Sequence, residues 1–355
     1  MPTSECFARV PPFPDQVPTV ELQRVELSKL LSGDEAESEA LFEACTGLGF
    51  FLLDLRGCAE GQGLLKETEA GFDVSREFYA LSDEEKSKFP LLPSNLGYKP
   101  IGGTKIEDGR PDRCEIYSLP TDDLVGLAPP IRNPPPFEKS RPLLTSCAKH
   151  LHSVATTILT HLSAHLGLPP RTLSSMHALT ERSPSNLRFL HMPPQRASAA
   201  QTSLMGHTDN GSVTVLFNVV GGLQVLDGTN GWRYVRPEPG HAVINLGDSM
   251  VQLTGGVVRS NMHRVVPAPG AQSESPRFSI AYVLKPPYAC RMERLKGEGI
   301  PRGEEEEEEK EKVGTYEEFH AKKSKGIREG KNLVGSRGGK KTEKKVDVRV
   351  NEVMA

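Results

Sequence analysis

The stretch LMGHTDNGSVTVLF, from Leu204 to Phe217, places a histidine and an aspartate one residue apart at the start of a β-prone run. Side chains at positions i and i+2 of a strand point to the same face, so His207 and Asp209 converge if this segment enters a strand. Imidazole and carboxylate groups both bind transition metals. The pair alone leaves a simpler alternative open, because a His–Asp hydrogen bond at the end of a strand has the same sequence pattern.

Two later segments extend this pattern. SNMHRVVP places His263 at the start of another β-prone run, and RFSIAYVL places Arg277 and Ser279 at positions i and i+2 of a further one. Two histidines and one carboxylate on neighbouring strands can form the facial triad of non-haem Fe(II) oxygenases, which leaves three coordination positions open. The planar guanidinium of Arg277 suits a carboxylate, and the Ser279 hydroxyl is expected beside it. An anionic ligand held at one end by Arg277 would then reach the metal at its other end.

The order of predicted elements indicates an α+β protein, with helices first and a β core second. Apolar residues recur at three- or four-residue steps in two segments, of which the clearer runs from Leu143 to Leu166. Between these helices, the segment from Pro90 to Pro142 is rich in Pro and Gly and is expected to be a long loop. From Asn186 onward, short β-prone runs separated by Gly, Pro, Asn and Asp are typical of a sandwich, barrel or jelly roll. The runs are NLRFLHM, SVTVLFNVV, GLQVL, WRYV, HAVINLG, VVRS, HRVV and RFSIAYVL.

Several other polar residues have a structural interpretation. Four helical histidines lie mostly off the apolar stripe and are predicted to be solvent-facing or partly buried rather than metal ligands: His150, His152, His161 and His165. Asn245 and Asp248 are interpreted as fixing a strand and a turn. His241 follows a Pro-Gly turn and is expected to be exposed.

Composition excludes several classes of protein. The chain has 355 residues and a formal net charge of −3, which gives no indication of a nucleic-acid surface. Its start has no apolar signal-peptide region, and no apolar run approaches the ~18 residues of a membrane span. The six cysteines lack the paired spacing of a disulfide scaffold or a zinc site, which favours reduced thiols in the cytosol.

The C-terminal segment, residues 296–355, is predicted to be a charged tail that is partly disordered. GEEEEEEKEK, from Gly303 to Lys312, cannot bury apolar surface. TYEEFHAKKSKGIREG is compatible with one helix, and GSRGGKKTEKK is basic and Gly-rich. A solvated tail explains the basic stretch more simply than a nuclear-localisation or nucleic-acid-binding role.

These motifs together resemble the 2-oxoglutarate- and Fe(II)-dependent dioxygenases of the isopenicillin N synthase-like family, in particular its fungal-type members. The resemblance covers roughly Pro18 to Pro287 and rests most on GHTDNGSVTVLF, GGLQVL, WRYVRPEPGHAVINLGDSMVQLTGG, SNMHRVVP and RFSIAYVLKP. Three earlier segments, VPTVEL, ACTGLGFFLLD and FYALSDEEKSKF, are similar to the N-terminal region of that family. The predicted organisation is an N-terminal dioxygenase region over residues 15–135, a helix plus catalytic jelly-roll region over residues 136–290, and the charged tail.

The resemblance implies that His207, Asp209 and His263 form the catalytic Fe(II) site, and that Arg277 and Ser279 bind the 5-carboxylate of the cosubstrate 2-oxoglutarate. It also implies a double-stranded β-helix (jelly roll) core backed by helices. The implied reaction uses O2 and releases succinate and CO2; hydroxylation is its usual outcome, and desaturation and ring closure are variants. The expected substrate is a small hydrophobic or aromatic metabolite of secondary metabolism. The enzyme is expected to be a cytoplasmic monomer that binds neither nucleic acid nor membrane.

One position departs from the family pattern. Many relatives carry a tyrosine before the proline of a YP motif, whereas NLRFLHMPPQ has Met192 there. The contact of that tyrosine is then absent or is supplied by Arg188 or His191. Other candidates for the pocket wall are Tyr98, Lys99 and Arg113 in the middle loop and Leu204, Met205, Phe217 and Leu223 in the β region, although core packing explains the apolar ones equally well.

The sequence leaves three alternatives open. The first is an iron enzyme that does not use 2-oxoglutarate, because isopenicillin N synthase itself is an oxidase. A catalytically inactive binding protein of the same fold is another, although the presence of all three ligand residues argues against it. A zinc hydrolase is the third, and it lacks an obvious general base beside the metal.

Overall fold

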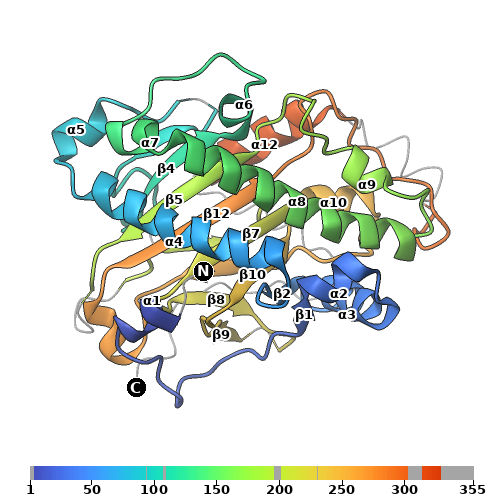
Figure 1. Ribbon diagram of the computed structural model, residues 1–355, viewed down its shortest axis with the longest axis horizontal. Coiled ribbons are helices and arrows are strands. Elements are labelled where there is room, and N and C mark those ends of the chain that lie inside the picture. Colours follow the sequence, from blue (N-terminus) through green and yellow to red (C-terminus); the bar gives the residue numbers. More distant parts are fainter. Residues whose placement is uncertain are drawn as a thin grey trace.

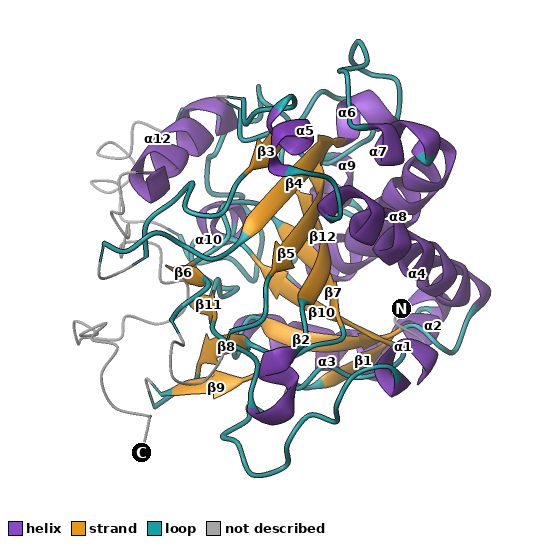
Figure 2. Cartoon of the chain, turned by 90° about the vertical axis from the view of Figure 1, so that its left-hand side faces the viewer, coloured by secondary structure: helices purple, strands orange, loops and turns teal. Residues whose placement is uncertain are grey.

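The computed structural model describes residues 4–92, 94–106, 109–195, 201–229, 231–302 and 314–328. Within these ranges, two β-sheets form the core, and the long helices cover the outer face of the larger sheet (Figures 1 and 2). This arrangement confirms the predicted α+β class. The acidic run from Gly303 to Lys312 and the basic GSRGGKKTEKK stretch lie outside the described residues.

The larger sheet has eight strands in the order β1-β2-β10-β7-β12-β5-β4-β3. Neighbouring strands are antiparallel except β1 and β2, which are parallel. In chain order the strands are β1 (Arg24–Glu26), β2 (Phe50–Asp54), β3 (Gly97–Lys99), β4 (Glu115–Pro120), β5 (Asn186–Met192), β7 (Val213–Asn218), β10 (His241–Leu246) and β12 (Arg277–Leu284).

The smaller sheet has four short antiparallel strands in the order β6-β11-β8-β9. These are β6 (Leu204–His207), β8 (Leu223–Leu226), β9 (Trp232–Tyr234) and β11 (His263–Val265). A cluster of buried apolar side chains joins the two sheets and includes Leu190 on β5, Val225 on β8 and Val243 on β10. The sheets therefore enclose an apolar interior between them.

Two long helices, α4 (Ala59–Tyr79) and α8 (Arg141–His165), run across the outer face of the larger sheet (Figure 1). The bounds of α8 confirm the predicted helix. The other helical segments are α1 (Ser4–Ala8), α2 (Leu27–Ser32), α3 (Glu35–Thr46), α5 (Asp83–Ser87), α6 (Thr121–Leu124), α7 (Pro135–Lys139), α9 (Thr172–Ser175), α10 (Asp248–Leu253), the 3-10 helix η2 (Gly270–Glu274) and α12 (Tyr316–Arg328). None of the helices in the described ranges combines the length and apolar character that a membrane span requires.

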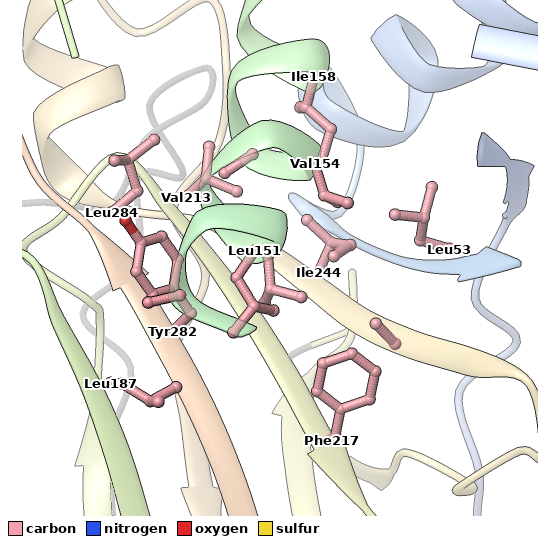
Figure 3. Packing of buried hydrophobic residues seen from close by; sticks show 14 of the residues in the cluster. Leu53, Leu151, Val154, Ile158, Leu187, Val213, Phe217, Ile244, Tyr282 and Leu284 are labelled. Atoms are coloured by element: carbon pink, nitrogen blue, oxygen red, sulfur yellow. The ribbon is translucent and has the colours of Figure 1, made fainter. Parts of the chain in front are cut away.

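The main hydrophobic core lies between α8 and the larger sheet (Figure 3). Leu151, Val154 and Ile158 lie on one face of α8, as their spacing predicts, and at most 4% of each is exposed. They pack with side chains of the sheet that include Ile244 on β10 and Leu284 on β12. Because burying one such side chain contributes roughly 1.5–3 kcal/mol, this layer holds the larger sheet in place.

The prediction of a long loop from Pro90 to Pro142 is wrong in part, because this segment contains β3, β4, α6 and α7. Strand β4 pairs with β5 in register from Glu115 opposite His191 to Pro120 opposite Asn186. Its sequence, EIYSLP, is short, lacks alternation and lies among Pro and Gly residues, so the pairing with β5 decides its conformation.

The segment VVRS, Val257 to Ser260, is also not a strand. It follows a turn at Gly255 and Gly256, whose φ angles are 60° and 85°, and Val258 is buried there without pairing in a sheet. Positive φ angles favour glycine and interrupt an extended backbone. The β-prone composition of this run therefore reflects burial.

The prediction for the helical histidines holds for His150, His161 and His165 and is wrong for His152. His152 is buried against β12, where its Nδ1 lies 3.2 Å from the hydroxyl of Tyr282. Burial lowers the pKa of His152 to about 4, so this histidine is neutral in the folded protein.

Candidate metal centre

The three predicted metal ligands converge at the edge of the smaller sheet. His207 is the last residue of β6, and His263, the first residue of β11, lies opposite it in the strand register. The spacing suggested that Asp209 lies on a strand, but it lies in the turn that follows β6. It still faces the histidines, since its Oδ1 lies 3.8 Å from His207 Nε2 and 4.0 Å from His263 Nε2. The potential ligand atoms of the three side chains all lie within 4.8 Å of one another.

Hydrogen bonds orient both imidazole rings. His207 Nδ1 lies 2.9 Å from the carbonyl oxygen of Met205, and His263 Nδ1 lies 3.2 Å from that of Asn261. When Nδ1 donates to a carbonyl, Nε2 is left unprotonated and available to a metal. The ring of His263 also packs edge-on against Phe50 at a centroid distance of 5.3 Å. Both Nε2 atoms therefore face the carboxylate of Asp209.

The Asp209 carboxylate is held by one of its two oxygens. Oδ2 accepts hydrogen bonds from Thr214 Oγ1 at 2.6 Å and from Asn245 Nδ2 at 2.8 Å, so Oδ1 is the oxygen that faces the histidines. Burial alone would raise the pKa of Asp209, but His263, His207 and these two hydrogen bonds hold it below its ordinary value. Asn245, which the sequence suggested only as a strand-fixing residue, thus orients a predicted metal ligand.

The protonation states suit a divalent metal. Burial, followed by the proximity of His263, lowers the pKa of His207 to about 4, so the imidazole is neutral near pH 7. Neutral imidazole and ionised carboxylate are the forms that bind metals. Two imidazole nitrogens and one carboxylate oxygen are also the donor set of non-haem Fe(II) oxygenases. The residues present therefore fit an iron ion.

A cavity of about 250 Å³ opens beside these three residues. It lies between the sheets, because its walls include Leu190 and Ala281 from the larger sheet and Leu204 and Leu223 from the smaller one. Leu204, Met205 and Leu223 line the cavity as suggested, whereas Phe217 belongs to the core under α8. Polar side chains, among them Arg188 and Arg277, share the lining with these apolar residues and can orient a ligand.

Arg277 and Ser279 lie side by side on β12, and both line this cavity. Arg277 is 4% exposed, its Nε donates to the carbonyl oxygen of Gly221 at 2.9 Å, and one terminal nitrogen donates to Ser279 Oγ at 3.1 Å. No carboxylate in the described part of the chain pairs with this guanidinium, and burial lowers the pKa of Arg277 to about 10. A buried cation without an acidic partner is costly, so an anionic ligand is the expected partner.

Met192 occupies the position where the family resemblance led us to expect a tyrosine. Its sulfur lies 3.9 Å from a terminal nitrogen of Arg277, so the thioether contacts the guanidinium. Of the two proposed substitutes, Arg188 lines the cavity and His191 does not. The imidazole of His191 lies 2.7 Å from Glu115 and stacks on Phe278 at a centroid distance of 4.7 Å.

The middle-loop candidates have mixed outcomes. Lys99 lines the cavity, but its ammonium group already contacts Asp112 and the carbonyl oxygen of Cys114. Tyr98 donates to Glu115 at 2.6 Å and is buried, and Arg113 is not among the cavity walls. These contacts assign Lys99 and Tyr98 a structural role.

The expectation that His241 is exposed is wrong. It is 8% exposed at the start of β10, where its Nδ1 lies 2.9 Å from the carbonyl oxygen of Pro239 and its Nε2 lies 3.7 Å from Asp54. The Pro-Gly turn leads directly into a strand of the larger sheet, and pairing with β2 covers the side chain.

Sequence reasoning missed the contribution of helix α12. His320 forms part of the cavity wall, and Lys323 contacts the turn that carries Asp209. The helix itself is expected from TYEEFHAKKSKGIREG, but nothing in that segment indicates which surface it covers. The charged composition of the tail pointed instead to solvent.

Comparison with known proteins decides the family. The 2OG-Fe(II) oxygenase superfamily matches residues 183–286, which contain all five predicted site residues. The N-terminal region described as non-haem dioxygenase in morphine synthesis matches residues 17–137. The chain belongs to the 2OG-Fe(II) oxygenase superfamily.

Two curated relatives support this membership. The chain is 34% identical over 267 residues to the 2-oxoglutarate-dependent dioxygenase frbH of Dothideomycetidae sp., which covers 74% of this chain and 81% of the relative. It is 32% identical over 273 residues to the 2-oxoglutarate-dependent dioxygenase gloE of Glarea lozoyensis, covering 76% and 81%. This oxygenase is therefore an Fe(II)- and 2-oxoglutarate-dependent dioxygenase that uses O2.

Solved structures confirm the jelly-roll fold. A full-length Neurospora crassa protein in complex with alpha-KG superposes with a TM-score of 0.72 at 23% identity, covering 84% of this chain and 94% of that one. A 2OG-Fe(II) oxygenase family protein from Caulobacter crescentus superposes with a TM-score of 0.71 at 23% identity, covering 87% and 100%. The two-sheeted core of this oxygenase is thus the double-stranded β-helix that the sequence motifs implied.

Proposed function

We propose that His207, Asp209 and His263 bind the Fe(II) of this dioxygenase, and that Arg277 and Ser279 bind the 5-carboxylate of 2-oxoglutarate. One observation carries the proposal: three ligand atoms within 4.8 Å of one another border the same cavity as a buried guanidinium with no acidic partner among the described residues. In this arrangement the metal binds one end of the cosubstrate and the guanidinium binds the carboxylate at its other end.

The residues of the chain have separate tasks in this proposal. When bound, Fe(II) with 2-oxoglutarate and O2 supplies the oxidising power for hydroxylation, and succinate and CO2 are released. Asn245 and Thr214 hold one oxygen of Asp209 so that the other faces the metal position. Arg277 orients the cosubstrate through its fixed guanidinium plane. The apolar walls exclude water from the substrate.

We propose that the substrate is a small, mainly apolar or aromatic metabolite with one anionic group, and that Arg188 binds this group. Arg188 lines the cavity, its Nε donates to Asn186 Oδ1 at 2.9 Å, and no acidic side chain of the described residues forms an ion pair with it. In the strand register Arg188 lies opposite Ala281, whereas Arg277 lies opposite Met192. These positions are four residues apart along β5, about 13 Å, so the two arginines can hold separate anionic groups.

Metabolites of this kind suit a role in secondary metabolism, and we include that role in the proposal. The proposal also includes a cytoplasmic location and a monomeric state. The apolar cavity favours a small molecule over a macromolecular substrate because its volume is only about 250 Å³.

The first experiment does not require the substrate. Purified full-length protein is loaded anaerobically with Fe(II) and titrated with 2-oxoglutarate, and the visible charge-transfer band of a chelated 2-oxo acid is followed. We expect a saturable band that is lost in His207→Ala. Bound iron without a band would contradict the proposed cosubstrate site and favour an oxidase that binds its substrate through Arg277. Absence of metal binding would contradict the iron site itself.

A second experiment tests Arg188. Succinate release is measured with pairs of small aromatic and aliphatic compounds, each a carboxylate and its primary amide. We expect carboxylates to stimulate turnover, and Arg188→Met to remove this stimulation while the 2-oxoglutarate affinity stays the same. Stimulation by amides alone, or by carboxylates equally in Arg188→Met, would show that Arg188 does not select the substrate.

A further inference from the structure

Helix α12 lies on the opposite side of the β core from α4 and α8, near α10 (Figure 2). Its first residue is anchored, since the Tyr316 amide donates to the carbonyl oxygen of Cys290 at 2.8 Å and the next amide donates to that of Tyr288 at 3.1 Å. Three of its residues, at positions i, i+4 and i+7, share one helix face: Tyr316, His320 and Lys323. The position of this face relative to the core is therefore set from its N-terminal end.

This face contacts three consecutive residues of the turn that carries the Asp209 carboxylate. The Tyr316 hydroxyl donates to the carbonyl oxygen of Asn210 at 3.2 Å, and His320 Nδ1 lies 2.7 Å from the side-chain nitrogen of Asn210. Lys323 Nζ donates to Thr208 Oγ1 at 2.9 Å and to the carbonyl oxygen of Asp209 at 3.3 Å. Each residue of the turn thus has a partner on α12.

Burial separates this face from the rest of the helix. Tyr316 is 0% exposed and Lys323 is 7% exposed, whereas Glu317, Glu318, Ala321 and Lys322 are all exposed. A lysine is rarely buried unless it is paired. Here the ammonium group forms an ion pair with Asp248, whose own side chain accepts from Thr208 Oγ1 at 3.0 Å.

Lys323 and α10 hold the same atom of the Asp209 main chain. The Asp248 amide at the start of α10 donates to the Asp209 carbonyl oxygen at 2.8 Å, and Lys323 donates to it from α12. Thr214 and Asn245 are the side-chain partners of Asp209, and both contact its Oδ2. The direction of Oδ1 therefore depends on where the main chain of Asp209 is held.

We infer that α12 is part of the catalytic centre and that Lys323 is a positioning residue, which fixes the main chain of Asp209 and so directs its carboxylate toward His207 and His263. The inference rests on the proposed function, because it assigns Asp209 to the metal. Lys323 acts through Asp209 and does not contact the reacting atoms. Groups that orient metal ligands typically change metal affinity by about 10- to 100-fold when they are removed.

The test uses full-length Lys323→Met, which keeps the length of the side chain and removes the ammonium group. Lys322→Met is the matched control, because Lys322 is the neighbouring residue on the exposed face. Ni(II) binding to the metal-free protein is titrated, and the melting temperature of each metal-free protein is recorded. We expect Lys323→Met to weaken Ni(II) binding about 10-fold or more, and Lys322→Met to bind like the wild type. We expect Lys323→Arg to recover part of the affinity.

A purely structural role would have a different signature. If Lys323→Met melts at a lower temperature but binds Ni(II) with wild-type affinity, the inference is wrong. If this variant does not fold, Tyr316→Phe provides the test, because it removes only the hydroxyl that holds Asn210; wild-type Ni(II) affinity in Tyr316→Phe would then overturn the inference. Failure of the wild type to bind Ni(II) would instead contradict the proposed function, so the two failures are distinguishable.

Discussion

The histidines of the proposed metal centre lie on strands of four and three residues, β6 and β11, whereas the arginines that line the cavity lie on β5 with seven residues and β12 with eight. The long strands sit in the middle of the larger sheet and are backed by α4 and α8 (Figure 2). The short strands belong to the smaller sheet, and the Asp209 carboxylate that faces the two histidines is held by hydrogen bonds from Thr214 on β7 and Asn245 on β10.

This difference separates two ways of holding a site. On the larger sheet, Arg277 and Arg188 are placed by a continuous ladder and by a packed apolar layer behind it. Beside the smaller sheet, the orientation of Asp209 depends on individual polar contacts, such as those of Asn245 from β10 and Lys323 from α12. Changes to the apolar layer or to the two arginines should therefore affect stability or anion binding, and changes to the polar contacts around His207, Asp209 and His263 should affect the metal.

The largest expected effect is on the smaller sheet. We expect His207→Ala to abolish iron binding and turnover, because two ligands remain where the metal requires three from the protein. The melting temperature of the metal-free protein should change little, since His207 is only partly buried. Iron content after dialysis measures the effect, and His150→Gln on the surface of α8 is the control. Iron retained at wild-type level in His207→Ala would remove His207 from the ligand set.

The apolar layer provides the converse test. Ile158 on α8 is 0% exposed, so we expect Ile158→Ala to lower the free energy of unfolding by about 4 kcal/mol. The folded fraction should bind Ni(II) with wild-type affinity, because the layer lies behind the larger sheet. Urea unfolding measures the stability, and Ile101→Ala, at a residue 42% exposed, is the control. Loss of metal affinity in folded Ile158→Ala would show that the two regions are not separate.

A change at the proposed anion site is expected to weaken 2-oxoglutarate binding and to leave metal binding unchanged. We expect Arg277→Ala to raise the Kd for 2-oxoglutarate about 100-fold, or roughly 3 kcal/mol, because a charged hydrogen-bonding partner of the carboxylate is removed. Ni(II) affinity should be unchanged. Titration of the charge-transfer band measures the Kd, and Arg233→Ala, at a surface ion pair with Asp227, serves as the control. An unchanged Kd in Arg277→Ala would place the cosubstrate elsewhere.

The smallest expected effect is a change in how stability depends on pH, and it concerns the buried histidine His177. His177 is 3% exposed, lies 2.7 Å from Ser212 Oγ, and burial lowers its pKa to about 4 from an ordinary value of 6.5. Between these pH values the unfolded chain binds a proton and the folded protein does not, so the contribution of His177 to stability is lost as the pH falls. Between pH 7 and pH 5 this amounts to about 2 kcal/mol.

His177→Gln tests this contribution. Unfolding free energies of the variant and the wild type are measured at pH 7 and at pH 5. We expect the variant to be less stable than the wild type at pH 7 and to lose less stability on acidification. Parallel pH profiles for the two proteins would show that His177 does not titrate with a lowered pKa.

Most of the β core could be predicted because most of its strands carry their own local pattern. The runs that became β5, β7, β10 and β12 are rich in β-branched and aromatic residues and end at turn-forming residues. Strand β4 could not be predicted in this way, since EIYSLP becomes a strand only by pairing with β5. The burial of Glu115 within it depends on Lys86, Tyr98 and His191, which come from three other segments.

By itself the sequence indicated the chemistry of this oxygenase: which side chains are predicted to bind metal and anion, and their positions beside strands, because strand alternation and metal preference are local properties of residue type and spacing. Only the tertiary structure decided what holds those side chains. Lys323 reaches Thr208 across 115 residues of sequence, and Asn245 reaches Asp209 across 36. Such contacts depend on which surfaces the folded core brings together, and no local pattern in a charged tail or a buried strand specifies that partner.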